Sequence, residues 1–130
     1  MVKKIKIKIK GYLRSIQNNQ NSQINVIGIK NENKIQYILD NVKHKIEIKE
    51  DKIVLIREND EFKNTLEFIK NKESISYYLL KEKKFLVDIN IKTKKLEYTN
   101  NKIKIVYEVS DSQDEFEYVL EMRKMYEYKK

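Results

Sequence analysis

The single histidine of the chain and one of its three arginines are brought together by the most regular stretch of the sequence, residues 43–58. Isoleucines alternate there with charged residues on both sides of a polar step at Glu50-Asp51, and this period of two predicts a β-hairpin. Symmetric pairing about the turn predicts three pairs on the apolar face: Ile48 with Ile53, Ile46 with Leu55, and His44 with Arg57. An arginine beside an imidazole is suited to hold a carboxylate or a phosphate group.

Tyr77 is the third candidate binding residue. Pairing about a predicted turn at Asn71-Lys72 matches Phe68 with Ile75 and Leu66 with Tyr77, which places the Tyr77 hydroxyl on the inner face. If the interior holds a ligand, we expect His44, Arg57 and Tyr77 as its polar contacts and four apolar residues as its walls: Ile46, Leu55, Leu66 and Phe68. The structural alternative is that all three polar side chains only satisfy backbone groups at the end of the sheet.

Other chemistry is excluded by what the sequence lacks. One histidine and no cysteine cannot form a multi-histidine or thiolate metal site, so no metal is expected. The chain has no glycine-rich phosphate loop, nucleophile elbow or H-E-x-x-H motif. The carboxylates lie at outward positions of the alternating segments, where solvated charge explains them. The sequence therefore predicts a protein that is not an enzyme, with no catalytic residue and no cofactor.

The net charge of +8 and the pI near 9.4 raise the question of a nucleic-acid or membrane-surface partner. Arginine, which phosphate recognition favours, supplies only three of the 28 basic residues. Lysine, isoleucine and asparagine dominate the chain, as A/T-rich codons would produce, and lysines also keep exposed strand edges from pairing. A solvated lysine surface is therefore preferred over a functional basic one.

Nine tyrosines among lysines would suit single-stranded nucleic acid, whose bases stack on aromatic rings. The tyrosines concerned are spread over distant segments: Tyr12, Tyr98, Tyr107, Tyr118, Tyr126 and Tyr128. The opening MVKKIKIKIK has a lysine next to every isoleucine, so it predicts neither a signal peptide nor a membrane span. We expect a cytoplasmic protein.

Strands account for the first half of the chain. A long strand over about 2–16 has isoleucines on one face and lysines on the other, and Gly11 within it marks a bend or bulge. A polar loop over 17–23, a strand over 24–30 and a turn at 31–33 follow. The next alternating residues are Ile35, Tyr37 and Leu39.

The second half continues the pattern. A helix over 60–70 fits the spacing of Phe62, Leu66 and Ile69, but the strand is the stronger prediction. The apolar phase changes from odd to even numbers after Ile91, so a bulge or bend is required near 92–95. The pairs beyond it are Leu96 with Ile105 and Tyr98 with Ile103. The last strand carries Phe116, Tyr118, Leu120 and Met122, and continues toward Tyr126 and Tyr128.

Nine or ten strands joined by short turns predict an all-β fold in one domain over 1–130. Successive hairpins make an antiparallel up-and-down meander, and closure into a β-barrel is the way such a meander hides its edges. A two-sheet sandwich is the alternative architecture.

The order of segments resembles the YwiB-like family of small bacterial proteins, a domain of unknown function. The residues that carry the resemblance are KIKIKIKG at 4–11, IVLIR at 53–57, LEF at 66–68, the tyrosines at 77–78, IKTKKLE at 91–97 and IKIVYEV at 103–109. LLKEKKF at 79–85 departs from the family's Thr-Pro-Tyr-Gly-like turn, and the lipocalin Gly-X-Trp signature is absent. The resemblance implies a calycin-like (lipocalin-like) barrel and brings no activity, ligand or catalytic residue with it.

Taken together, the residues favour a non-enzymatic barrel that binds a small molecule or a protein partner. The alternatives are a basic barrel that binds single-stranded nucleic acid and a barrel filled by its own side chains that acts at its surface.

Overall fold

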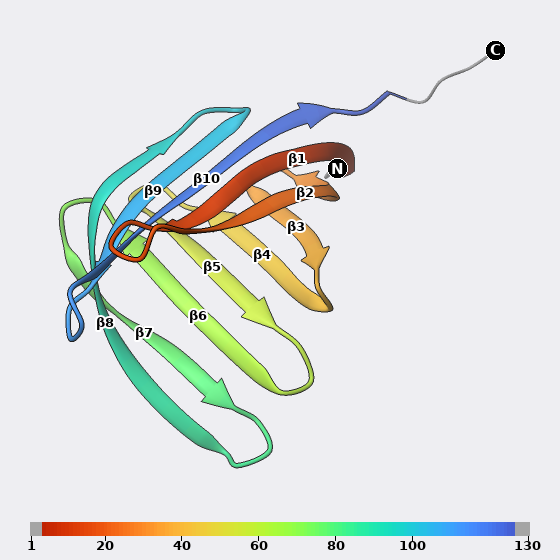
Figure 1. The fold of residues 1–130 in the computed structure, drawn as a ribbon. Helices are drawn as coiled ribbons and strands as arrows, with labels where there is room; N and C mark the ends of the chain where they lie inside the picture. The colour runs from red at the N-terminus through yellow and green to blue at the C-terminus, as the bar shows by residue number, and fades with distance from the viewer. Residues whose placement is uncertain (1–3, 127–130) are drawn as a thin grey trace.

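The computed structural model describes residues 4–126, and every regular element in that range is a β-strand. The ten strands are β1 (Lys4–Ser15), β2 (Gln20–Asn31), β3 (Lys34–Leu39), β4 (Val42–Ile48), β5 (Lys52–Glu58), β6 (Phe62–Ile69), β7 (Glu73–Leu80), β8 (Phe85–Tyr98), β9 (Lys102–Val109) and β10 (Asp114–Lys124). Each strand pairs antiparallel with its neighbours in the chain, and β1 also pairs with β10, so the sheet closes (Figure 1). The predicted all-β, up-and-down barrel is confirmed.

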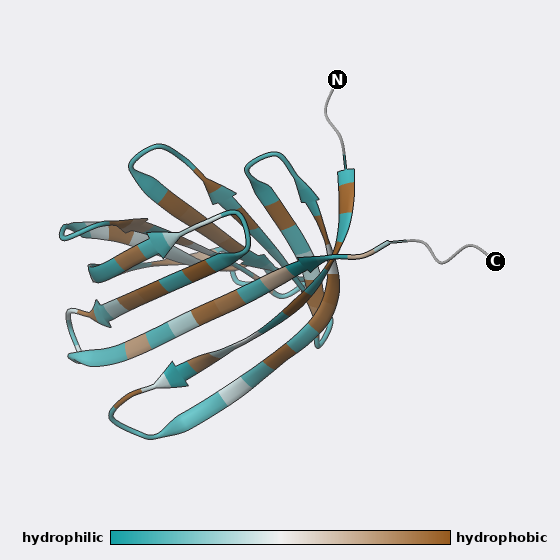
Figure 2. Ribbon diagram, turned by 90° about the horizontal axis from the view of Figure 1, so that it is seen from above, coloured by the Kyte–Doolittle hydropathy of each residue, from teal (hydrophilic) through white to brown (hydrophobic). Residues whose placement is uncertain are grey.

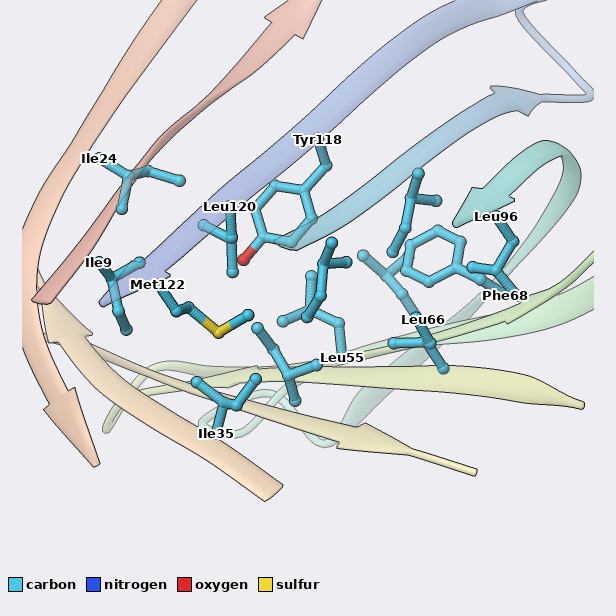
Figure 3. Packing of buried hydrophobic residues seen from close by; sticks show 14 of the residues in the cluster. Ile9, Ile24, Ile35, Leu55, Leu66, Phe68, Leu96, Tyr118, Leu120 and Met122 are labelled. Carbon is cyan, nitrogen blue, oxygen red and sulfur yellow. The ribbon is translucent and has the colours of Figure 1, made fainter. Parts of the chain in front are cut away.

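Alternate side chains of the strands fill the interior. Apolar and polar bands follow one another along the strands in Figure 2, as period-two alternation requires. Figure 3 shows Ile9, Ile35, Leu55, Phe68 and Leu120 converging from different strands. The fully buried side chains among residues 4–126 are Ile7, Ile9, Ile35, Ile46, Ile53, Phe68, Ser76, Ile91, Thr93, Ile103, Ile105 and Leu120.

Most predicted hairpins have the predicted register. In β4 and β5, Ile48 faces Ile53, Ile46 faces Leu55 and His44 faces Arg57. In β8 and β9, Leu96 faces Ile105 and Tyr98 faces Ile103, and the ladder shifts between Thr93 and Lys95. The bulge required by the phase change is therefore confirmed, and it lets Thr93 and Leu96 both face inward.

Two boundaries differ from the prediction. β1 and β2 stay paired as far as Ser15 with Gln20, so the polar residues expected in a loop over 17–23 mostly belong to β2. Their edge-strand position exposes them to solvent, which is why polarity did not end the strand. The last strand ends at Lys124, and Tyr126 lies beyond it, 85% exposed. The predictions at Val2 and Tyr128 lie outside the described residues.

The register of β6 and β7 corrects a prediction. Thr65 faces Tyr77 and Asn64 faces Tyr78, so the expected pairs Leu66 with Tyr77 and Phe68 with Ile75 do not form. Beyond Thr65, serine hydroxyls replace the backbone ladder: Glu67 N–H donates to Ser76 Oγ at 3.2 Å, and Ser74 Oγ–H donates to the Glu67 carbonyl. A shift of one residue turns every side chain to the other face. Tyr77 therefore points outward.

Candidate functional site: a cavity at the mouth of the barrel

A cavity of about 240 Å³ lies at the end of the barrel where β1–β2, β3–β4, β5–β6, β7–β8 and β9–β10 turn. We call this end the mouth. The apolar lining residues are Leu13, Ile24, Leu39, Val42, Leu55, Phe62 and Phe68. The polar ones are Ser22, Tyr37, Asp40, His44, Arg57, Tyr107 and Tyr118. Although half of the lining residues are polar, most of the surface that they turn toward the cavity is apolar. A largely apolar surface with convergent polar groups is the usual form of a small-molecule site.

The strand pair β2 and β3 leaves part of the cavity wall without a backbone ladder. These strands pair only through residues 29–31 and 34–36. Toward the mouth, Ser22 and Ile24 of β2 and Tyr37 and Leu39 of β3 line the cavity from the two sides of the unpaired stretch. This part of the cavity wall is therefore not closed by β2–β3 ladder pairing.

His44 and Arg57 lie side by side in this cavity, as the hairpin register predicts. The imidazole stacks on the Tyr37 ring, with centroids 4.5 Å apart and planes 6° apart. His44 Nδ1 and Arg57 Nε are buried and have no hydrogen-bond partner among the described residues. No salt bridge within residues 4–126 involves Arg57. The cavity thus contains a guanidinium with unused hydrogen-bonding capacity.

The position of His44 decides its charge. Burial, together with the positive charge of Arg57, lowers the pKa of the imidazole from 6.5 to about 4, and the nearby Asp40 opposes this only in part. His44 is therefore neutral near pH 7, and Arg57 is the cation of the pair.

This depressed pKa makes a stability prediction. The unfolded chain takes up a proton at His44 below about pH 6.5, whereas the folded chain does so only near pH 4. Stability supplied by the neutral imidazole is present above pH 6.5 and is lost as the pH falls toward 4. After allowance for the partial exposure of the ring, we expect a loss of about 1–2 kcal/mol between pH 7 and pH 5.

Urea unfolding of the wild type and of His44→Gln at both pH values measures this loss. The carboxylates are common to both proteins, so the difference isolates His44. An equal loss of stability in the two proteins would contradict the assigned pKa.

Three tyrosines complete the cavity, and the sequence analysis did not assign them to it. The hydroxyl oxygens of Tyr37 and Tyr118 are 2.7 Å apart and hydrogen-bonded. Burial raises the pKa of Tyr118 well above its ordinary value and also raises that of Tyr107. Alternation along the strand could have placed two of them inside. Tyr37 lies two residues from the core residue Ile35, and Tyr118 lies two residues from the core residue Leu120.

Tyr77 does not belong to the cavity. It is 42% exposed on the outer face and does not line the cavity. The expectation that its hydroxyl joins Leu66 and Phe68 on the inner face is wrong. Of the four predicted wall residues, Leu55 and Phe68 line the cavity, while Ile46 and Leu66 pack in the core.

The described tyrosines differ in their surroundings. Tyr107 and Tyr118 are buried inside, Tyr12 donates a hydrogen bond to Glu117 at 2.7 Å, and Tyr98 and Tyr126 are exposed. The outward lysines of β1 form no ion pair in the part of the chain that the structure describes: Lys4, Lys6, Lys8 and Lys10.

Across residues 4–126, no three histidine, aspartate or glutamate side chains gather as metal ligands. The same range has no helix with the length and apolarity to cross a membrane.

Comparison with known proteins gives one informative likeness. No family model and no curated protein matches the chain. The crystal structure of the YwiB protein from Bacillus subtilis is similar, with a TM-score of 0.70 over 96% of each chain and 16% sequence identity. At that identity the likeness concerns the fold alone. The chain therefore has a YwiB-like barrel fold, in agreement with the resemblance of its segments.

Proposed function

We propose that the barrel binds a small, largely apolar molecule with one carboxylate group in the cavity at its mouth. The observation that carries the proposal is Arg57, a permanently charged side chain that lines an apolar cavity without a salt-bridge partner among residues 4–126. A charge in such surroundings is stabilised by an anionic partner. His44 Nδ1 and the paired hydroxyls of Tyr37 and Tyr118 supply further hydrogen-bonding groups.

The charge of the cavity favours a carboxylate over a phosphate. Arg57 is its one cationic side chain, because His44 is neutral near pH 7 and Asp40 at the rim adds a negative charge. A single guanidinium balances a monoanion but leaves a phosphate dianion uncompensated. The volume of about 240 Å³ lies below the range of roughly 300–1,000 Å³ for sites of drug-sized ligands, so the ligand is small.

The proposal includes broader expectations from the sequence. The barrel is taken as a calycin-like binding protein of the bacterial cytoplasm that has no catalytic activity. A protein partner at the outer surface remains compatible with a filled cavity. Binding of single-stranded nucleic acid is not favoured, because two of the tyrosines needed for stacking face the interior.

Octanoate and its uncharged match 1-octanol test the site by calorimetry or NMR titration. We expect octanoate to bind more tightly than octanol. Arg57→Met should weaken the binding of octanoate about 30-fold or more, because a hydrogen bond to a charged group contributes roughly 2 kcal/mol or more. The binding of octanol should change little. Arg14→Met is the matched control, because Arg14 pairs with Glu117 on the outside at 3.2 Å. Equal binding of the two probes, or an equal effect of both variants, would refute the carboxylate site. Native mass spectrometry of protein from its own host should also show a bound mass that Arg57→Met removes.

A further inference from the structure

The β7–β8 hairpin projects beyond the wall of the barrel on one side. Pairing of β8 with β9 begins only at Ile91, opposite Val109, whereas pairing of β8 with β7 continues to Phe85. Residues 85–89 are thus paired on one side only, over about 16 Å at roughly 3.3 Å per residue. In Figure 1 this hairpin extends past the turn that joins β5 and β6.

The free edge presents backbone hydrogen-bonding groups. Ser110 N–H donates to the Asn90 carbonyl at 2.9 Å, so the polar groups of Asn90 point toward β9. Backbone direction alternates along a strand, so the N–H and C=O groups of Leu86 and Asp88 point the same way. No described strand lies on that side to pair with them. Such an edge is a template for another strand.

The side chains of this edge are apolar except for Asp88. Phe85 is 59% exposed, Leu86 56% and Val87 40%, and the sequence FLVDI at 85–89 has no lysine, proline or glycine to discourage pairing. The edge of β2 that β3 leaves unpaired, residues 20–28, provides a contrast at the end near the mouth, where residues 20–25 are polar except for Ile24, although Ile27 farther along is 52% exposed. The β8 edge combines free backbone groups with exposed apolar side chains on both faces.

We propose that residues 85–89 pair antiparallel with the same residues of a second copy of this chain, about a twofold axis at Val87. Leu86 and Asp88 of each copy then exchange their free N–H and C=O groups, four hydrogen bonds in all by geometry. On the face that continues into the core, Val87 meets Val87 and Phe85 meets Ile89. On the other face, Leu86 lies opposite Asp88 of the second copy.

A second copy fits this edge better than a lipid surface does. The exposed Phe85 and Leu86 would suit a membrane, but the free N–H and C=O groups of Leu86 and Asp88 would stay unsatisfied in hydrocarbon. Strand pairing covers the apolar side chains and satisfies the backbone together. The pattern is also self-complementary about Val87, as a twofold interface requires.

A cysteine at Val87 tests both the pairing and its register. The chain contains no cysteine, so Val87→Cys introduces a unique thiol. Because Val87 faces its symmetry mate in a non-hydrogen-bonded pair, the Cα atoms are about 4.5 Å apart, within disulfide range. We expect mild oxidation to convert most of this variant into a covalent dimer of twice 15.8 kDa. The control is Ile38→Cys, at a site 66% exposed on β3, and it should stay monomeric.

Sedimentation velocity over a range of concentrations provides the second measurement. Wild type should pass from monomer to dimer as the concentration rises. Val87→Lys places two like charges opposite each other and should raise the dissociation constant of the dimer at least tenfold. Ile38→Lys should leave that dissociation constant unchanged. Equal cross-linking of the two cysteine variants would overturn the proposal. A chain that is monomeric at every concentration would also overturn it. Co-sedimentation of that monomer with uncharged phosphatidylcholine vesicles, lost in Val87→Lys, would assign the hairpin to a membrane surface instead.

Discussion

Replacement of Gly11 by alanine is expected to lower the free energy of unfolding by about 3 kcal/mol or more. Gly11 lies in β1 opposite Leu120 of β10, at the seam that closes the barrel. A Cβ atom there would overlap the carbonyl oxygen of Val119 and lie 2.8 Å from its carbonyl carbon. Both neighbours are backbone atoms, so the methyl group is accommodated only if the two strands move apart. The glycine that the sequence marks as a bend or bulge therefore permits the close approach of two backbones.

Equilibrium urea unfolding of Gly11→Ala against wild type measures this effect. Gly28→Ala is a graded comparison, because a Cβ there would lie 2.6 Å from the Gln36 carbonyl oxygen and 2.7 Å from Ile9 Cδ1, which can move. We expect a smaller loss at Gly28 than at Gly11. A Gly11→Ala protein as stable as wild type would show that the seam opens without strain.

Replacement of Phe68 by alanine is expected to destabilise the fold by about 3–5 kcal/mol. Phe68 is fully buried, packs against Tyr107 with ring centroids 4.9 Å apart, and forms part of the cavity lining. Truncation removes the apolar contacts of a whole ring and leaves a void that the rigid strands of the barrel cannot fill. The void also adds to the cavity, so the variant should accept a longer carboxylate than wild type does.

Thermal and urea unfolding of Phe68→Ala, Phe68→Leu and Tyr126→Ala separate packing from general effects. Phe68→Leu keeps most of the volume and should lose about 1–2 kcal/mol. Tyr126 is 85% exposed, so its truncation should change stability by less than about 0.5 kcal/mol. Losses of similar size in all three variants would mean that Phe68 is not a core residue.

Local pattern determined much of this protein. In β4 and β5, one apolar residue in two leaves a single register that buries the isoleucines, and the same register places His44 beside Arg57. The apolar positions change from odd to even numbers between Ile91 and Leu96. A bulge between them keeps both residues inside. Strict alternation and tight turns are local signals, and the strands, their hairpins and half of the cavity follow from them.

Tertiary structure decided the strand register where the local sequence pattern fitted two registers equally well. The sequence ISYYLL at 75–80 is nearly as apolar in one phase as in the other, so alternation could not choose between Tyr77 and Tyr78 for the interior. The register that forms is the one in which the hydroxyls of Ser74 and Ser76 bond to the backbone of Glu67.

Closure of the barrel decided the rest. It brought Tyr37 of β3 within hydrogen-bonding distance of Tyr118 of β10, although the two residues are 81 positions apart. The unequal lengths of β8 and β9 left residues 85–89 without a second neighbour. Contacts between distant strands and the relative lengths of neighbouring strands depend on how the whole sheet curls and closes. The alternation of apolar and polar residues along one strand carries no information about this.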